Sequence, residues 1–268
     1  MMTLTLAELA LALDARLMGE DGEISAVSTD TRTLGAGALF VALRGERFDA
    51  HDFCEQAVQA GAAALLVERE LPLAIPQLVV ADSLKGLGRI GKLVRERINP
   101  KVLAITGSCG KTTVKEMATA ILRHEGDVLA TAGNFNNEVG VPLTLLRLEP
   151  QHQFAVMELG ANHKGEIAWT TSLAKPDAAI INNVAAAHLE GFGSLEGIFH
   201  AKSEIFEGLR EGGTAIVNAD NEFWPKWRER GIGCGFSIDD QSQPFHARDV
   251  ALNAQGCAEF VLVTPQGE

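Results

Sequence analysis

Residues 102–117, VLAITGSCGKTTVKEM, decide the fold of the chain's larger part. An apolar run leads into a turn with two glycines, a lysine and two threonines, and a helical pattern follows. In this order, turn amides and the helix N-terminus bind phosphate, the lysine reaches the β- and γ-phosphates, and the first threonine hydroxyl binds Mg²⁺. Ala104 stands where the longer motif has glycine, so this is the short G-x-x-G-K-T form. We predict a phosphate-binding turn in which Gly107 and Gly110 let the backbone approach phosphate oxygens, beside Lys111 and Thr112.

Cysteine usage indicates a reduced environment. Cys54, Cys109, Cys234 and Cys257 stand far apart and form no C-x-x-C pair. We therefore expect a cytoplasmic chain without structural zinc. Cys109 suits a small turn position, and a catalytic thiol is disfavoured because no base lies nearby in the sequence.

Composition predicts a globular protein of two domains. The chain has 268 residues, of which 46% are hydrophobic and 22% charged. The net charge of -12 argues against a nucleic-acid partner. The start, MMTLTLAELALALDARL, has helical periodicity without a basic leader, and no run of 18 apolar residues exists. We expect a first helix rather than a signal peptide, no membrane span, and a monomer.

The first predicted domain, residues 1–82, is a small α/β unit in which short strands alternate with one or two helices. Helices are expected at residues 6–15 and 54–60, and strands within 24–32, 37–43, 62–68 and 76–82. The segment 83–100 reads as a helix that carries the chain onward and ends near Pro100.

The second predicted domain, residues 83–268, has a mainly parallel sheet covered by helices. Nearly continuous apolar strands are expected at 101–106, 154–160, 178–184 and 214–220, which is typical of parallel sheets buried on both faces. Ligands bind at the carboxyl ends of such strands, where Gly107, Glu158, Asn182 and Asn183 stand. After Gly235 the pattern indicates antiparallel strands.

Polar residues near these strand ends each allow two interpretations. Glu158 closes an apolar strand, where a carboxylate either binds a cation or caps local backbone. His188 follows another strand, where it is either a metal ligand or a structural residue whose ring nitrogens are hydrogen-bonded within the protein. Lys202, on a predicted helix with Glu204 and Glu207, is by default a solvated lysine.

The asparagine-rich segment AGNFNNEVGVP, residues 132–142, is similarly open. It is either a tight loop or a loop whose amides hold phosphate or sugar oxygens.

Seven stretches together resemble the Mur ligase family, in the right order and over nearly the whole chain. They are STDTR (28–32), LFVALRGERFDAHDF (39–53), TGSCGKT (106–112), GNFNNEVGVP (133–142), ELGANHKGEI (158–167), AAAHLEGFGS (185–194) and AKSEIF (201–206). The first two match the family's UDP-sugar-binding domain, and the others match its central ATPase domain.

The resemblance implies an ATP-dependent amide ligase of cytoplasmic peptidoglycan precursor synthesis. ATP would phosphorylate the terminal carboxylate of UDP-MurNAc-tripeptide, and the amine of D-Ala-D-Ala would attack the acyl phosphate. ADP and phosphate would then leave. Mg²⁺, at two sites, would bring the anions together.

The resemblance also implies roles for single residues. Lys111, His188 and Lys202 would be catalytic, and Thr112, Glu158, His188 and Lys202 would hold metal, Lys202 as a carbamate formed with CO₂. The ATP phosphates would be held by Gly107, Ser108, Cys109, Gly110, Lys111, Thr112 and Thr113. Asn137 would face the nucleotide, with Asn134 and Asn136 toward the sugar substrate. The uridine-nucleotide site would comprise Thr29, Thr31, Arg32, Gly45, Glu46, Arg47, Phe48 and Asp49.

Two departures from the family pattern stand out. Ser203 replaces the glycine of the usual A-K-G-E-I motif, which weakens the carbamate assignment. A third, carboxy-terminal domain and the G-R-H-N-x-x-N-A segment before it are missing, so we expect the chain to end inside the second domain and to turn over negligibly alone.

Three other hypotheses stay open. The chain could belong to another ligase of the superfamily, such as MurE or a folylpolyglutamate synthase. It could be a generic P-loop kinase, in which the asparagine loop and lysine motif would have no purpose. A non-catalytic nucleotide-binding or interaction module is the third.

Overall fold

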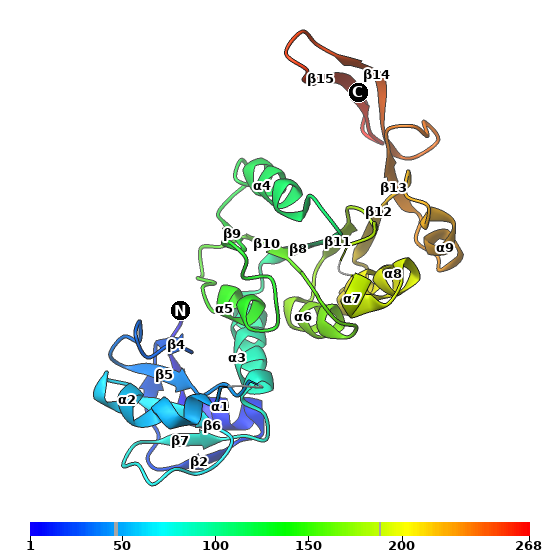
Figure 1. The fold of residues 1–268 in the computed structure, drawn as a ribbon. Helices are drawn as coiled ribbons and strands as arrows, with labels where there is room; N and C mark the ends of the chain where they lie inside the picture. The colour runs from blue at the N-terminus through cyan, green and yellow to red at the C-terminus, as the bar shows by residue number, and fades with distance from the viewer. Residues whose placement is uncertain (46–47, 188) are drawn as a thin grey trace. The chain divides into compact units, whose positions relative to one another are not determined.

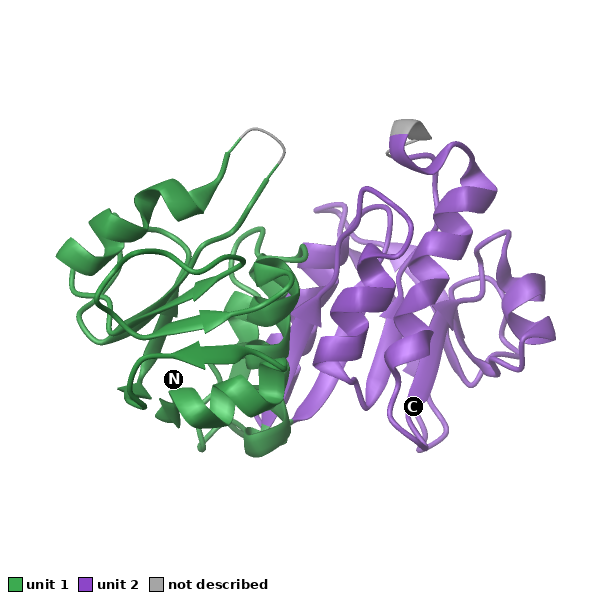
Figure 2. Ribbon diagram, turned by 90° about the horizontal axis from the view of Figure 1, so that it is seen from below, with its two compact units in different colours: residues 1–100, 126–153 green, residues 101–125, 154–268 purple. Residues whose placement is uncertain are grey.

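The computed structural model describes residues 1–45, 48–187 and 189–268, with Leu189 and Glu190 described in backbone only. It divides into two compact units, coloured green and purple in Figure 2. The first unit comprises residues 1–100 and 126–153, and the second comprises residues 101–125 and 154–268. The chain thus leaves the first unit at residue 100, returns for 28 residues (126–153), and leaves it again.

The first unit contains a five-stranded sheet with the order β2-β7-β6-β5-β4. Only β2 is antiparallel to its neighbour, and the other pairs are parallel. A separate antiparallel pair joins β1 to β3. The strands are β1 (Leu4–Thr5), β2 (Arg16–Met18), β3 (Glu23–Ile24), β4 (Ala26–Ser28), β5 (Ala38–Val41), β6 (Ala64–Val67) and β7 (Gln77–Val79). The expected strands are confirmed, and β2 was not foreseen because its three residues show no clear alternation.

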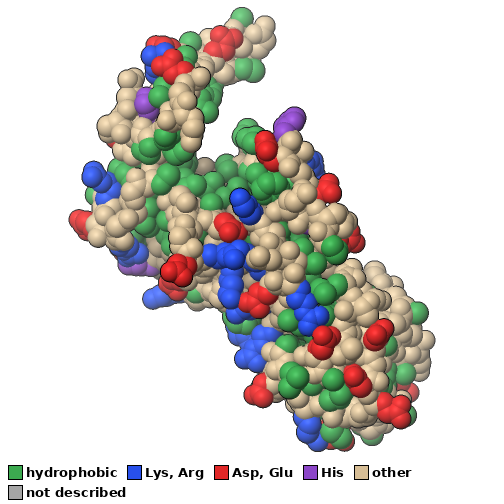
Figure 3. Space-filling model, turned by 180° about the vertical axis from the view of Figure 1, so that it is seen from behind, with side chains coloured by type: hydrophobic (Ala, Val, Ile, Leu, Met, Phe, Trp, Pro, Cys, Tyr) green, Lys and Arg blue, Asp and Glu red, His purple; other side chains and the backbone are tan. Residues whose placement is uncertain are grey.

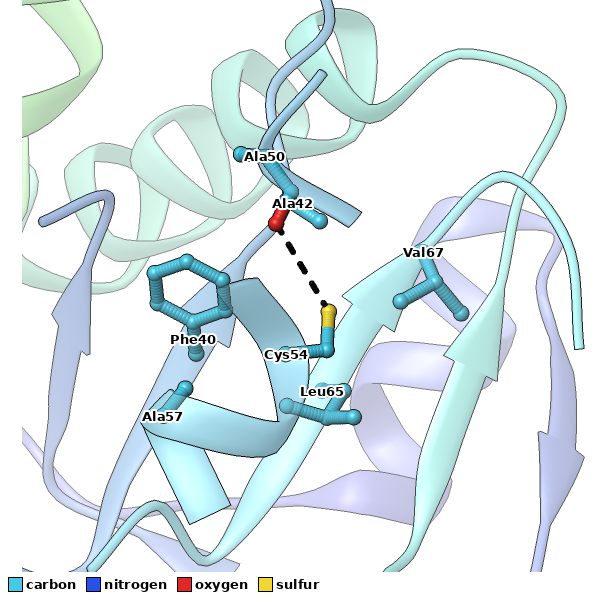
Figure 4. Packing of buried hydrophobic residues seen from close by; sticks show 7 residues of the cluster. All are labelled: Phe40, Ala42, Ala50, Cys54, Ala57, Leu65 and Val67. Carbon is cyan, nitrogen blue, oxygen red and sulfur yellow. Dashed lines mark hydrogen bonds between the residues drawn. The ribbon is translucent and has the colours of Figure 1, made fainter. Parts of the chain in front are cut away.

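Continuous apolar strands form the core of this unit. Every residue of β5 and β6 is buried, as strands flanked by neighbours on both sides require. Their side chains pack against a 3₁₀ helix, η1 (Ala50–Phe53), and α2 (Cys54–Gln59). Figure 4 shows this cluster, with the Cys54 thiol directed at the Ala50 carbonyl oxygen 3.9 Å away.

The remaining elements of the first unit are α1 (Leu6–Leu13), α3 (Ser83–Ile98), β9 (Val128–Ala130) and α5 (Gly140–Leu145). Asp82 caps the start of α3 by accepting from Lys85 N, and Asn99 ends the helix with a left-handed φ of 52° just before Pro100. A Cβ at Gly91 would lie 3.0 Å from Pro142 Cα, so glycine allows the backbones of α3 and α5 to meet. The helix that we expected to open the second domain therefore belongs to the first compact unit. The functional boundary at residue 82 stays a prediction.

In the second unit the strands follow the order β15-β14-β13-β12-β11-β8-β10 (Figure 1). All neighbouring pairs are parallel except β14 with β15. The strands are β8 (Lys101–Thr106), β10 (Phe154–Glu158), β11 (Ala178–Ile181), β12 (Thr214–Asn218), β13 (Cys234–Ser237), β14 (Phe245–Leu252) and β15 (Ala258–Val263). The predicted α/β class with a mainly parallel sheet is confirmed. β13 was missed. It pairs with β14 in parallel, so β14 is antiparallel to β15 only.

The helices of this unit are α4 (Lys111–Leu122), α6 (Glu166–Ala174), α7 (Leu189–Phe192), α8 (Leu195–Ser203), the 3₁₀ helix η2 (Glu204–Gly208) and α9 (Trp224–Glu229). The register pairs Glu158 of β10 with Ile105 of β8, and Ile181 of β11 with Thr106. The carboxyl ends of these three strands therefore meet at one edge of the sheet, where the phosphate turn begins.

The surface charges and the apolar lengths of the helices bear on two predictions from the sequence. On the face drawn in Figure 3, acidic and basic side chains are interspersed. No helix in the described residues is long and apolar enough to cross a membrane.

Candidate functional site

The predicted phosphate turn lies between β8 and α4, as expected. Gly110 ends the turn with a left-handed φ of 74°, and α4 begins at Lys111. A Cβ at Gly110 would lie 2.9 Å from Asn182 Nδ2, and one at Gly107 would lie 3.2 Å from Asn182 Cβ. Both positions are thus crowded by the segment that follows β11, and Gly110 also needs the left-handed conformation that glycine adopts without strain.

That same segment, residues 182–185, holds the turn by hydrogen bonds. The Cys109 amide donates to Asn183 Oδ1, and the Cys109 carbonyl accepts from Asn182 Nδ2 and Asn183 Nδ2, each at 3.0 Å. The Ser108 hydroxyl donates to the Ala185 carbonyl and accepts from the Ala185 amide, each at 2.9 Å. Sequence reasoning noted the two asparagines at a strand end but gave them no role. Their position beside a glycine turn was the available signal.

Two side chains at the start of α4 are fixed by this edge of the sheet. Lys111 Nζ donates to the Gly107 carbonyl at 2.9 Å, so the lysine folds back over the turn. The Thr112 hydroxyl donates to Glu158 Oε2 at 3.0 Å. Glu158 is only 3% exposed. A buried carboxylate next to a hydroxyl at a phosphate turn provides the oxygen donors that Mg²⁺ prefers.

Lys202 corrects one expectation. We expected by default a solvated lysine, but the residue is 4% exposed. The pKa of Lys202 is lowered to about 8, mainly by burial and also by the positive charge of Lys111, while Cys109 acts in the opposite direction. The helical pattern alone could not reveal this burial, because it depends on which elements pack around α8. The structure thus brings Lys202 within electrostatic range of the phosphate turn.

Beyond Thr112 and Glu158, the described residues offer no cluster of ionisable side chains for a metal ion. There, no group of three His, Cys, Asp or Glu side chains is placed to hold a metal ion. His188, the predicted second-metal ligand, lies outside the described residues. The fit to a cation therefore rests on Thr112 and Glu158.

The first unit contains a cavity of about 610 Å³ at the predicted uridine-nucleotide residues. Its walls are Thr29, Asp30, Thr31, Arg32, Phe40, Phe48, Ala50, Phe53 and Gln56. The rings of Phe48 and Phe53 stack with centroids 5.2 Å apart and planes at 25°. Phe53 and Gln56 were missed, although Phe53 ends the quoted motif of residues 39–53 and Gln56 lies three positions after it. Aromatic walls and a cation suit a base linked to phosphate.

Arg32 is paired within this cavity. Its Nη2 lies 2.7 Å from Asp30 Oδ2. Hydrogen bonds from Arg32 lower the pKa of Asp30 to about 2. The Arg32 side chain is 83% exposed, so it keeps donors available for a ligand.

The Asp49 carboxylate is hydrogen-bonded to His51 and Arg69 of the same unit. Its Oδ1 accepts from the His51 amide at 3.0 Å and lies 2.5 Å from His51 Nδ1, and its Oδ2 is 3.1 Å from Arg69 Nη1. His51 Nε2 accepts from the Glu68 amide at 2.8 Å, so the Nδ1 carries the proton toward Asp49. Gly45 donates through its amide to the Phe48 carbonyl. Glu46 and Arg47 lie outside the described residues.

The predicted asparagine loop belongs to the first unit. Asn137 Oδ1 accepts from the Gly140 amide at 2.8 Å, and the Asn136 amide donates to the Asn134 carbonyl. These bonds make a tight loop ahead of α5. Contacts of Asn134, Asn136 and Asn137 with nucleotide or sugar stay predictions.

Comparison with known families gives two matches. The model described as "Mur ligase middle domain" matches residues 105–268, and the one described as "Mur ligase family, catalytic domain" matches residues 23–105.

Known proteins add three relatives. The chain is 53% identical, over its whole length, to a UDP-N-acetylmuramoyl-tripeptide--D-alanyl-D-alanine ligase of Escherichia coli K12, of which it covers 60%. A crystal structure of MurF from Acinetobacter baumannii aligns with a TM-score of 0.93 at 42% identity, over 99% of this chain and 59% of that one. A MurF ligase from Thermotoga maritima in complex with ADP aligns with a TM-score of 0.78 at 28% identity, over 89% and 58%. The chain therefore spans about 60% of the length of these relatives.

Proposed function

The chain belongs to the Mur ligase family, and on that premise we propose that it binds ATP and a UDP-linked sugar peptide for amide-bond formation. The substrates we propose are UDP-MurNAc-tripeptide and D-Ala-D-Ala. The name of the 53% identical relative supports this choice. Cytoplasmic location, a monomeric state and negligible turnover by these 268 residues alone stay predictions.

The observation that carries the proposal is the phosphate turn of the second unit. Gly107 and Gly110 are required by the contacts around them, and Lys111 folds over the turn. The N-terminus of α4, a 12-residue helix, directs its free amides to the same place. Phosphoryl transfer asks a protein mainly to position the groups and to neutralise charge. One relative was solved in complex with ADP, which supports nucleotide binding by this chain.

Mg²⁺ is the cation we propose for the same edge. The residues that would hold it are Thr112 and Glu158, with His188 and Lys202 proposed for a second ion. When bound, Mg²⁺ neutralises phosphate charge and aligns the phosphoryl group with its acceptor. The Thr112 hydroxyl can offer a lone pair to a cation while its hydrogen donates to Glu158, and a cation would give the buried carboxylate a charged partner.

Lys202 has the chemistry needed for carbamylation. A pKa of about 8 leaves roughly a tenth of the amine neutral at pH 7, far more than for an ordinary lysine. A neutral amine attacks CO₂, forms an N–C bond and releases one proton, which converts a buried cation into an anionic carbamate. Such a group would be a metal ligand in place of a charge that burial disfavours.

In the reaction we propose, the tripeptide's terminal carboxylate attacks the γ-phosphorus of ATP, and the bond to ADP breaks. The D-Ala-D-Ala amine then attacks the acyl phosphate carbon, loses a proton, and phosphate leaves. Lys111 and the turn amides would hold the charge that develops on the phosphoryl oxygens.

In the first unit, the cavity beside Arg32 is the proposed seat of the uridine diphosphate end. The stacked pair Phe48 and Phe53 would pack against the base, and Arg32 would bind phosphate.

Ligand-induced stabilisation tests the proposal with crossed variants. Either ligand at 100 times its Kd should stabilise the protein by about 2.7 kcal/mol. Lys111→Ala should abolish the shift with Mg-ATP and keep the shift with UDP-MurNAc-tripeptide. Arg32→Ala should do the reverse. If saturating UDP-MurNAc-tripeptide leaves the melting temperature unchanged, the sugar-nucleotide assignment is wrong.

A further inference from the structure

Among the described residues, the side chain of Lys202 is positioned by packing and not by hydrogen bonds or ion pairs of its own. Its side chain is buried, and in the described part of the chain it makes no hydrogen bond or ion pair. Its position is therefore set by the backbone at the end of α8 and by packing. The two residues that follow it, Ser203 and Glu204, are also buried. Both are bonded to other elements, in different directions.

Glu204 ties the end of α8 to the start of α6. Its two carboxylate oxygens accept from the Gly165 amide at 2.8 and 3.0 Å, and Oε2 accepts from the Ala168 amide at 3.1 Å. Gly165 is the N-cap of α6, with a φ of 92° and no side chain to cap the helix. The carboxylate therefore replaces the missing cap and meets the positive end of the helix. Gly165 lies seven positions after Glu158, so these bonds link the loop after Glu158 to the residues beside Lys202.

Ser203 ties the same point to α9. Its hydroxyl donates to the Phe199 carbonyl at 2.7 Å and accepts from Trp227 Nε1 at 3.0 Å. The Trp227 ring is fully buried. Removal of the hydroxyl would leave a buried indole N–H without its acceptor. The serine that departs from the A-K-G-E-I pattern thus has a specific partner in this chain.

We infer that Ser203 and Glu204 are positioning residues for Lys202. Glu204 holds it against the loop that begins at Glu158, and Ser203 holds it against α9. Together they fix the backbone of Lys202 from two sides, so that its amine stays buried near Lys111 and Cys109. The inference rests on the proposed function, in which Lys202 becomes a carbamate ligand.

The first test measures the carbamate itself. The protein is equilibrated with ¹³C-bicarbonate and Mg-ATP, and the Lys202 carbamate is observed by ¹³C NMR, with Lys202→Arg to assign the signal. Glu204→Gln keeps the size but turns a donor toward a backbone amide, and Ser203→Ala removes the hydroxyl. Each should lower carbamate occupancy roughly tenfold, as loss of a supporting partner does at metal sites. Ser203→Thr should restore it, and Glu207→Gln, the same charge change at an exposed site on η2, should have no effect.

The second test works without a carbamate. The acetylation rate of Lys202 by acetic anhydride, relative to exposed Lys101, is measured by peptide mass spectrometry. Glu204→Gln and Ser203→Ala should raise this ratio roughly tenfold by opening the site locally. Thermal unfolding must stay cooperative and the Mg-free ATP affinity must stay near wild type.

The outcomes separate the two claims. A wild-type chain that binds ATP but shows no carbamate contradicts the carbamate proposal, and the acetylation ratio then decides the inference. Carbamate occupancy and acetylation that are equal in wild type and both variants overturn the inference and leave the proposed function standing.

Discussion

The Thr112 hydroxyl donates a hydrogen bond to Glu158 Oε2 at 3.0 Å, although 46 residues separate them in the chain. They meet because β8 and β10 are parallel neighbours whose carboxyl ends lie at one edge of the sheet. The bond gives a buried carboxylate a partner where an ATP-bound cation is proposed.

Loss of this hydroxyl should remove the magnesium dependence of nucleotide binding. Thr112→Ala is expected to weaken Mg-ATP binding roughly tenfold or more, and to change Mg-free ATP binding little, because one oxygen ligand is lost. Isothermal titration calorimetry with and without Mg²⁺ measures the two ATP affinities. Thr112→Ser should restore the dependence. An equal response to Mg²⁺ in wild type and Thr112→Ala would contradict the metal assignment.

Gly110→Ala should impair the phosphate turn for two reasons. The left-handed φ costs about 1–2 kcal/mol for a residue with a Cβ, and the new methyl would lie 2.9 Å from Asn182 Nδ2. We expect a loss of stability together with a loss of ATP affinity. The double variant Gly110→Ala/Asn182→Ala should recover only the steric part.

Gly212→Ala is the matched control for that prediction. Gly212 also has a positive φ, of 75°, but nothing lies within 4 Å of an added Cβ. Gly212→Ala should lose only the part of the stability that comes from the left-handed φ, as measured by urea unfolding, and should bind ATP normally. If both glycine variants affect ATP binding equally, the turn has no special role.

Cys109 should report nucleotide binding through its reactivity. Cys109 and Cys257 are exposed, whereas Cys54 is buried and burial raises its pKa to about 11. Iodoacetamide should alkylate the two exposed thiols and spare Cys54, since the thiolate is the nucleophile. ATP should protect Cys109 and leave Cys257 unchanged, as measured by peptide mass spectrometry. Equal rates with and without saturating ATP would place the nucleotide elsewhere.

The stacked rings of the first unit should contribute to UDP-sugar affinity. Phe48→Ala or Phe53→Ala is expected to weaken UDP-MurNAc-tripeptide binding by about 1–2 kcal/mol, since an aromatic wall is lost. Titration calorimetry measures the change. Phe260→Ala removes an exposed ring of the second unit and should not alter this affinity. Unchanged binding in both first-unit variants would contradict the cavity assignment.

Protonation of the Asp49 carboxylate should make the first unit less stable in acid. Hydrogen bonds from the His51 backbone, then from the His51 and Arg69 side chains, hold the pKa of Asp49 far below its usual range. A carboxyl with a lowered folded pKa adds stability above the unfolded pKa of about 4, and loses it as pH falls below that value. The stability difference between wild type and Asp49→Asn should therefore shrink between pH 5 and pH 2.

Urea unfolding at several pH values measures this difference. Asp52→Asn is the control, because Asp52 is an exposed carboxylate on the same 3₁₀ helix. If the Asp49→Asn difference is constant with pH, the network around His51 does not stabilise the charged carboxylate.

Local sequence was sufficient for most elements and for the phosphate turn. The strand of residues 101–106, the turn glycines and the helix after them act through near neighbours, so their pattern predicts them directly. The short strands β2 and β13 were missed because three or four residues with mixed polarity give no usable periodicity. Lys202 was misjudged for a different reason. The nearby Glu204 and Glu207 indicated an exposed position, and only packing against neighbouring elements removes the lysine from water.

The sequence by itself determined the α/β class, the family resemblance and the order of the binding motifs. These depend on residue type and on spacing along the chain. Only the tertiary structure decided that Asn182 and Asn183 hold the turn, that Asp49 serves His51 and Arg69, and that Glu204 caps α6. Such partners lie as far as 74 residues apart. Their meeting is set by strand register and helix packing, which no local pattern encodes.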